Sequence, residues 1–126
     1  EGKKPSKETD LHIGIYKVRP EAGAVFHVHT MFSTVLSLEG DEIPLLSLAG
    51  KTYLRRIPVL PEMKAGSAEL AEAVKGAFES KDIMAILLRG HGIVVAGRDI
   101  EHAFNITTLV EDSAKISYYS MLLRSK

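Results

Sequence analysis

Three histidines in this chain have the spacing of a metal site. His27 and His29 are separated by one residue in the run 24–29, and His91 stands between two glycines in the run 88–92. The run 24–28 is apolar and follows a glycine, a pattern typical of a buried strand. Residues two apart on a strand point to the same face, so we expect the first two imidazoles to project together, about 7 Å apart along the strand.

The donor set narrows the chemistry that such a site can support. Three protein ligands and one open position are the usual arrangement of a catalytic zinc, whereas a structural zinc normally has a fourth protein ligand. The chain has no cysteine, which excludes a thiolate site. Three imidazoles also suit cobalt, nickel or iron, because geometry and availability decide which divalent transition metal is held. By spacing alone, the histidines are equally compatible with ordinary core, turn or surface positions.

The composition is that of a globular protein and argues against several kinds of partner. The 126 residues suffice for one domain with its own core, and 45% of them are hydrophobic. Sixteen basic and sixteen acidic residues cancel, which argues against a nucleic-acid surface or a polybasic membrane patch. No apolar run approaches the roughly 20 residues of a membrane span. The absence of cysteine fits a cytoplasmic protein.

Helical and strand patterns follow one another along the chain and predict a layered α/β domain. Helices are expected from Thr9 or Asp10 to about residue 19, over 30–38, over 68–80 with a Ser67 cap, and over 100–123 with an Asp99 cap. Strands are expected at 24–29, near 43–46 and 53–59, at 83–88 and at 93–96. No repeat or linker interrupts these elements, so a single domain over 1–126 is expected.

The site residues lie in segments that together resemble the class II aldolase/adducin family, whose typical members are zinc-dependent sugar-phosphate aldolases such as fuculose-phosphate aldolase. The segments are residues 2–9, residues 19–29, and residues 87–95 followed by 97–104. The first resembles the family's Pro-Ser-Ser-Glu loop. The resemblance implies a three-layer αβα fold with a mostly antiparallel central sheet, and a homotetramer with active sites at subunit interfaces. It also implies that residues 1–126 lack the N-terminal part of the domain, which normally supplies much of the phosphate site.

The resemblance further implies a role for each site residue. His27, His29 and His91 would hold zinc, Glu8 would be the catalytic acid and base, and Ser6 would contact the substrate phosphate. Zinc polarises a carbonyl and stabilises an enediolate, while a carboxylate moves the proton. From the sequence alone, the glutamate is instead a solvated loop residue or a residue near the start of the following helix, and the serine is an ordinary loop residue. The family often has a second serine at position 7, where this chain has a lysine. His12 and His102 lie in expected helices and are interpreted as structural.

These roles favour a zinc-dependent lyase that cleaves a phosphorylated sugar to dihydroxyacetone phosphate and an aldehyde. Two related enzymes are alternatives: methylthioribulose-1-phosphate dehydratase and a pentulose-phosphate 4-epimerase. An adducin-like interaction domain is the non-enzymatic alternative, and retention of the three histidines with Glu8 argues against it. One departure counts against a simple transfer of activity. Fuculose-phosphate aldolases carry a tyrosine shortly after the position of Pro44, whereas the stretch 43–49 has none and Tyr53 is out of register.

Overall fold

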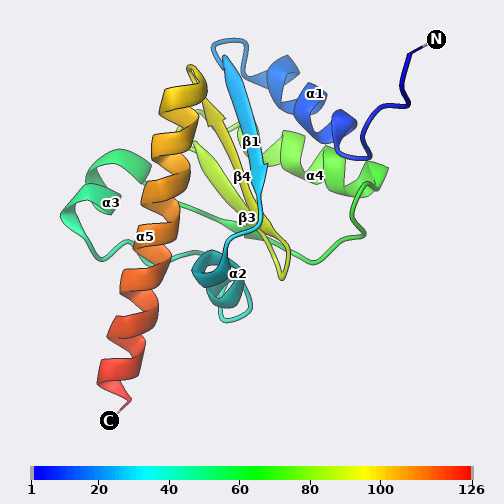
Figure 1. The fold of residues 1–126 in the computed structure, drawn as a ribbon. Helices are drawn as coiled ribbons and strands as arrows, with labels where there is room; N and C mark the ends of the chain where they lie inside the picture. The colour runs from blue at the N-terminus through cyan, green and yellow to red at the C-terminus, as the bar shows by residue number, and fades with distance from the viewer. Residues whose placement is uncertain (1, 126) are drawn as a thin grey trace.

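The computed structural model describes residues 2–125, which form one four-stranded sheet with helices on both faces (Figure 1). The elements are α1 (Thr9–Val18), β1 (Ala24–Val28), α2 (Met31–Ser37), α3 (Leu48–Leu54), β2 (Val59–Leu60), α4 (Ala68–Phe78), β3 (Ala85–Leu88), β4 (Gly92–Gly97) and α5 (Ile100–Arg124). The strand order is β1-β4-β3-β2. β4 is antiparallel to both of its neighbours and β2 is parallel to β3, so the sheet is mostly antiparallel, as expected.

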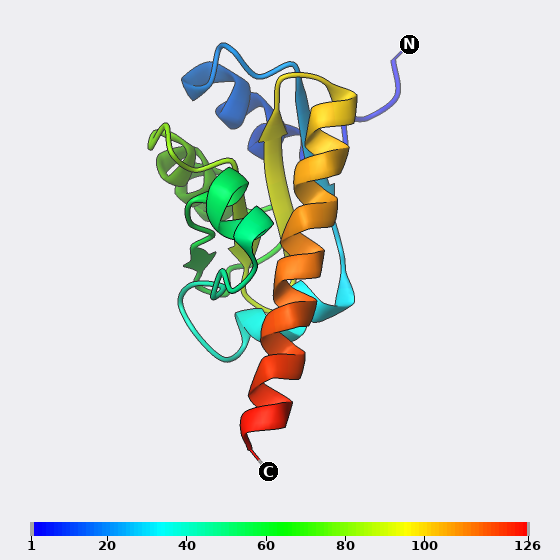
Figure 2. The same ribbon diagram turned by 90° about the vertical axis from the view of Figure 1, so that its left-hand side faces the viewer.

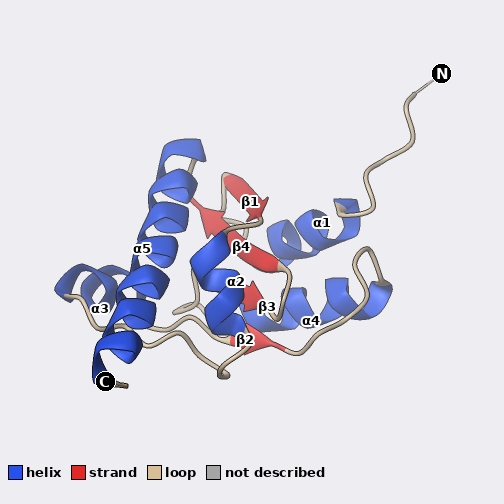
Figure 3. Ribbon diagram, turned by 60° about the horizontal axis from the view of Figure 1, so that its bottom comes forward, coloured by secondary structure: helices blue, strands red, loops and turns tan. Residues whose placement is uncertain are grey.

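The helices form two layers, one on each face of the sheet. α1 and α4 cover one face, while α5, with α2 and α3, covers the other (Figures 1 and 3). Figure 2 shows α3 beside α5, whose C-terminal part projects beyond the sheet. The expected three-layer αβα architecture is therefore confirmed. α5 has 25 residues, but neither it nor any other helix in the described part of the chain is apolar enough over a sufficient length to cross a membrane.

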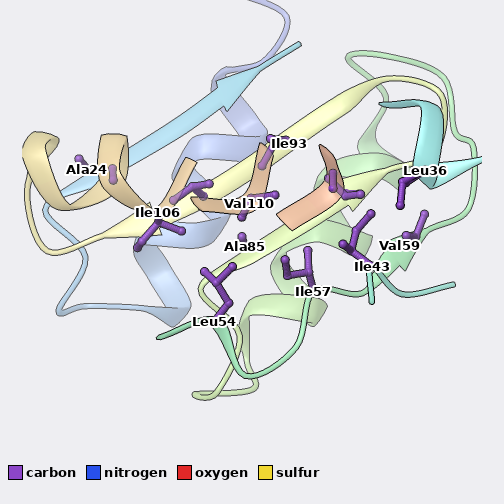
Figure 4. Close-up of a cluster of buried hydrophobic side chains, with 14 residues drawn as sticks. Ala24, Leu36, Ile43, Leu54, Ile57, Val59, Ala85, Ile93, Ile106 and Val110 are labelled. Carbon is purple, nitrogen blue, oxygen red and sulfur yellow. The ribbon is translucent and has the colours of Figure 1, made fainter. Parts of the chain in front are cut away.

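Alternate side chains of the strands pack in two different hydrophobic cores, because neighbouring side chains of a strand point to opposite faces of the sheet. Ile93 and Val95 of β4 join the core beneath α5, shown in Figure 4. Val94 and Ala96 join the core beneath α1 and α4. All six residues of β4 are buried. A strand covered on both faces is apolar along its whole length, and this explains the uninterrupted run that marks β4 in the sequence.

Most of the expected elements are present, but the segment between α2 and α4 differs from the prediction. The strand expected at 43–46 is wrong: these residues form a loop, next to an isolated bridge between Glu42 and Pro58. The strand expected at 53–59 is also wrong, since α3 occupies 48–54 and β2 has only two residues. The Ser47 side chain accepts a hydrogen bond from the Gly50 N–H and caps α3, so a helix replaces the strand.

The start of α1 is a smaller correction. The helix begins at Thr9, and the capping position belongs to Glu8 rather than to Thr9 or Asp10. No side chain caps α1. Instead, the Ser6 hydroxyl accepts a hydrogen bond from the Glu8 N–H at 3.2 Å. The glutamate therefore sits at the junction of loop and helix rather than within a flexible loop.

We expect Gly97→Ala to lower the free energy of unfolding by about 1–3 kcal/mol, because it overpacks a closed contact. An added Cβ at this position would lie 2.6 Å from the backbone nitrogen of Ala103, where α5 crosses the end of β4. The matched control is Gly76→Ala in α4, where an added Cβ meets nothing within 4 Å. That change should raise stability by about 0.5–1 kcal/mol. Urea unfolding of both variants measures the contrast, and equal stability of the two would contradict this packing.

Candidate metal centre

His27, His29 and His91 meet at one end of the sheet. The β1–β4 register places His27 opposite Val94 and Val28 opposite Ile93, so the end of β1 lies beside the turn that joins β3 to β4. The three imidazole centroids are separated by 5.1, 4.8 and 4.9 Å. One ring nitrogen from each residue lies within 4.8 Å of the others. The structure therefore brings together the three histidines whose spacing suggested a metal site.

The turn that carries His91 is shaped by its two glycines and fastened to α2. Gly90 has φ of +66°, the left-handed region that glycine adopts without strain. Gly92 is needed for a different reason, because an added Cβ would overlap the Val28 carbonyl and come within 2.9 Å of His29 Cδ2. The Gly90 N–H also donates to the hydroxyl of Ser37, at the end of α2, at 2.9 Å. The close approach of the two histidine-bearing segments thus depends on both glycines.

The hydrogen bonds of the cluster leave its nitrogens suited to a metal. His27 Nδ1 lies 3.0 Å from the Ile93 carbonyl oxygen, which can only accept, so Nδ1 carries the proton and Nε2 has a free lone pair. This Nε2 lies 3.3 Å from His91 Nε2. Two nitrogen ligands about 2.0–2.1 Å from a tetrahedral zinc lie about 3.3–3.4 Å apart. The arrangement therefore fits a metal ion, and the carbonyl contact is the kind of outer partner that orients metal-binding histidines.

The electrostatics of the cluster favour the neutral imidazole that a metal requires. Burial lowers the pKa of His91, and the neighbouring His27 and His29 lower it further, against the opposing charge of Glu8. Because the pKa of His91 is lowered, its ring is neutral at pH 7. A lone pair on the ring is then available to a metal without displacement of a proton. His29 is exposed, while the other two rings are partly buried, so the cluster is open to solvent on one side.

Glu8 and Ser6 come together at the start of α1, next to this cluster. They line one cavity of about 240 Å3 along with His12 and Tyr16. Glu8 Oε2 is buried and has no hydrogen-bond partner among residues 2–125. A buried carboxylate oxygen without a partner carries a desolvation penalty that a proton, a substrate hydroxyl or a cation would remove. The Ser6 side chain is exposed and, apart from accepting from the Glu8 N–H, has a hydroxyl proton to offer.

The direction of alternate side chains along β1 explains why Glu8 and the histidines lie on the same side of the sheet. Val25 packs in the core beneath α1 and α4, and residues 27 and 29 share its side of the strand. Glu8 belongs to the α1 layer on that same side. Its charge acts on the pKa values of both His12 and His91. The proton-transfer candidate and the metal-site candidates are therefore contributed by facing layers.

His12, interpreted from the sequence as structural, lies in the structure beside Glu8 and near His27. Burial lowers the pKa of His12, and the nearby His27 lowers it further, while the opposing Glu8 raises it. The available signal was its separation of four residues from Glu8, since residues four apart share one face of a helix. His102 does lie apart from the cluster: its Nδ1 accepts a hydrogen bond from the Arg98 N–H at the start of α5.

Glu111 of α5 fixes the helix that follows His29. Its carboxylate accepts hydrogen bonds from the N–H groups of Phe32 and Ser33 and from the Ser33 hydroxyl, at 2.7–3.0 Å. The side chain of Thr30, the residue at the capping position of α2, makes no capping bond. Burial raises the pKa of Glu111, but these hydrogen bonds outweigh it and leave the pKa below its ordinary value. A carboxylate from another helix of the same layer thus caps α2.

The comparison with known families agrees with this architecture. The model of the class II aldolase and adducin N-terminal domain matches residues 1–118. The chain belongs to this family. The crystal structure of L-fuculose-1-phosphate aldolase from Thermus thermophilus superposes with a TM-score of 0.88 at 31% identity, over 99% of this chain and 68% of the other.

Relatives of this chain are named for different enzymatic reactions. The L-fuculose phosphate aldolase of Methanocaldococcus jannaschii is 36% identical over 96% of the chain. A 3-oxo-tetronate 4-phosphate decarboxylase of Haemophilus influenzae is 35% identical over 93%, and a methylthioribulose-1-phosphate dehydratase of Acidiphilium cryptum is 38% identical over 82%. The chain spans 65%, 57% and 53% of the lengths of these three relatives. The family is therefore established, while the reaction differs among its members.

We expect the purified protein to hold about one divalent transition metal ion per chain and His91→Ala to lose it. Removal of one of three imidazoles leaves two ligands, too few for the three-ligand site that the geometry fits. His102→Ala is the matched control, because this histidine lies at the start of α5 and outside the cluster. Elemental analysis after exhaustive dialysis measures the metal. A wild-type protein that takes up no metal, or equal metal in both variants, would contradict the site.

The Glu111 cap predicts a specific acid sensitivity. Because the folded-state pKa is lowered, this group stabilises the fold fully above the ordinary value of 4.5 and loses its effect as pH falls through the folded-state pKa. We expect Glu111→Gln to reduce stability by about 1–2 kcal/mol at pH 7. Its difference from wild type should shrink as pH falls below about 4.5. Asp112→Asn, an exposed neighbour on α5, is the control in urea unfolding across pH. A difference that stays constant with pH would refute the charged cap.

Proposed function

We propose that this chain carries the metal-binding and proton-transfer half of a zinc-dependent lyase that cleaves a phosphorylated sugar, in the manner of an aldolase. The observation that carries the proposal is the apposition of three histidines to a buried, unpartnered carboxylate oxygen of Glu8. A metal site alone could be structural. A proton-transfer group beside it is the further part that a lyase requires.

The proposed metal ligands are His27, His29 and His91. A zinc ion held by these residues would supply Lewis-acid chemistry, by polarising a substrate carbonyl and offsetting negative charge on its oxygen. The Ile93 carbonyl holds the His27 ring with Nε2 directed to the cluster, which preserves the ligand geometry between turnovers. With three protein ligands, the site retains a position for substrate oxygens.

Glu8 is the proposed acid and base. Its position at the start of α1 is fixed by the helix that follows and by the hydrogen bond between its N–H and Ser6. Oε2 is free to accept a proton from the carbon next to the carbonyl, or from a substrate hydroxyl, and to return it. Ser6 contributes a hydroxyl to the phosphate end of the substrate, and Lys7 supplies a point charge in the same loop.

A phosphorylated sugar is the proposed substrate because the names of the relatives share this chemistry: fuculose phosphate, tetronate phosphate and methylthioribulose phosphate. Zinc is the proposed metal because three protein ligands with one open position are its usual catalytic arrangement, and the 3.3 Å nitrogen separation fits tetrahedral coordination. A homotetramer with active sites at subunit interfaces is part of the proposal. Such an assembly would supply groups that residues 2–125 of one chain do not place at the cluster.

Dehydration of methylthioribulose phosphate is the second candidate. It is supported by the 38% identity to an enzyme of that name, and by the absence of a tyrosine from residues 43–49, where the aldolases that this chain resembles have one. An aldolase reaction on this chain therefore requires a second proton donor from elsewhere. Product analysis separates the two.

We expect the zinc-loaded protein to release dihydroxyacetone phosphate from L-fuculose 1-phosphate, and Glu8→Gln to lower kcat by about 10²–10⁴-fold. The amide cannot take up the proton, but it preserves the shape of the side chain. Coupled enzymatic detection of dihydroxyacetone phosphate measures cleavage of L-fuculose 1-phosphate and of rhamnulose 1-phosphate. Methylthioribulose 1-phosphate is assayed in parallel by mass spectrometry for loss of water, because dehydration releases no dihydroxyacetone phosphate.

Two controls keep this experiment specific. Elemental analysis should show unchanged metal in Glu8→Gln, and Glu72→Gln, an exposed carboxylate on α4, should retain full activity. An active Glu8→Gln enzyme would exclude the proposed acid–base role. Activity on methylthioribulose 1-phosphate alone would replace the aldolase by the dehydratase.

A further inference from the structure

A second cavity lies at the end of the sheet opposite the histidines. It has a volume of about 610 Å3 and is lined by the end of α3, the segment before β3 and the first turns of α5. Arg98 directly follows β4 and Met84 directly precedes β3, whereas the histidine cluster lies at the other ends of these strands. Figures 1 and 2 show α3 beside the N-terminal half of α5, where this cavity opens. Pockets of about 300–1,000 Å3 are usual for small-molecule ligands.

The charged groups around this cavity are unevenly distributed. Arg55, Lys81 and Arg98 line it, against a single carboxylate, Asp82. The chain as a whole has equal numbers of acidic and basic residues, so this excess of positive charge is local. Lys81 has a distant partner in Glu21, 3.9 Å away. Within the described residues, the two arginine side chains have neither an ion pair nor a hydrogen bond.

A neutral donor and an apolar floor complete the lining. His102 Nδ1 accepts the Arg98 N–H at 3.0 Å, so the neutral ring carries its proton on Nε2 and remains a donor. Leu54 and Ile106 are buried, with Met84 beside them, and form an apolar floor. The combination suits a ligand with an anionic head and an apolar body, because guanidinium groups bind phosphate oxygens in pairs of hydrogen bonds.

The backbone conformation of Arg55 is a second, independent observation at this cavity. Its φ of +56° and ψ of −63° make it the one non-glycine residue with positive φ among residues 2–125. The Arg56 N–H bonds to the Leu54 carbonyl at 2.6 Å, so residues 54–56 form a strained γ-turn. Such conformations persist where the surroundings impose them, and they gather at ligand sites and switches. Here the strained residue places a guanidinium on the rim of the cavity.

We propose that this cavity binds a small phosphate monoester with an apolar body, through Arg55 and Arg98 at the rim and Leu54, Met84 and Ile106 at the floor. The site is separate from the metal centre and does not depend on the proposed lyase activity.

The test is a titration of the isotope-labelled intact protein with 1-naphthyl phosphate, followed by two-dimensional NMR in metal-free and metal-loaded forms. Amides of residues 52–55 and 98–109 should shift in both forms. The naphthyl ester should bind more tightly than inorganic phosphate, which lacks the apolar body. Arg55→Gln and Arg98→Gln should each weaken binding about tenfold. Arg56→Gln is the matched control, because it removes the same charge from the adjacent residue, which does not line the cavity.

A second variant separates binding from folding. Arg55→Gly relieves the positive φ, so we expect it to unfold at higher urea than wild type while it binds the ester about tenfold more weakly. Shifts confined to residues 6–12, 27–29 and 91 would assign the ester to the metal end and overturn the proposal. So would unresponsive amides around the cavity, as expected if another subunit covers it, or equal binding by Arg98→Gln and Arg56→Gln.

Discussion

The antiparallel register of β1 and β4 is the constraint on which the site depends. It sets Val28 opposite Ile93, so the chain leaves β1 beside the turn that joins β3 to β4. A slip of one residue would move His27, and His29 just after the strand, to the α5 side of the sheet, because side-chain direction alternates along a strand. The same register supplies the Ile93 carbonyl that orients the His27 ring. One backbone pairing therefore fixes the position, the sidedness and the tautomer of the cluster.

Burial on both faces holds that register in place. The alternating side chains of β4 enter two separate cores, so neither face can be exchanged for solvent. Gly97 and Gly92 mark the two ends of the strand, where α5 and the end of β1 approach too closely for a Cβ. The glycines at the ends of β4 thus permit the close approach of α5 and β1. The apolar residues between the glycines prevent a shift in the strand register.

Local patterns made much of this arrangement predictable from the sequence. Ser67 and Asp99 cap α4 and α5 as expected, because a side-chain oxygen three residues before a free N–H is a local signal. The three histidines were found by their spacing and by the resemblance to a family. The glycines on either side of His91 are residues typical of a tight turn, and Gly90 has the positive φ that this turn requires.

The rest depends on contacts that no local pattern encodes. The segment 53–59 looks like a strand because Tyr53, Leu54, Ile57 and Val59 favour extended structure. Packing decided otherwise: Leu54 and Ile57 are both buried, and the strained turn at Arg55 lies between them. The cap of α2 was equally hidden, because its carboxylate comes from Glu111, 79 residues from Phe32 in the chain. The nearness of His12 to His27 was hidden for the same reason, because it arises only when α1 packs against the sheet.

The packing of α1 fixes the position of Glu8. A carboxylate oxygen without a partner is costly when buried, and a longer loop would let it turn to water. Here the following residue already begins α1, and α1 is held by Leu11 and Ile15, which are buried in the core it shares with α4. The packing of the helix thus offsets the cost of leaving Oε2 unsatisfied. The packing of an apolar layer thus holds in place the carboxylate that we propose as the proton acceptor, and such fixed placement of a polar group is what a preorganised site requires.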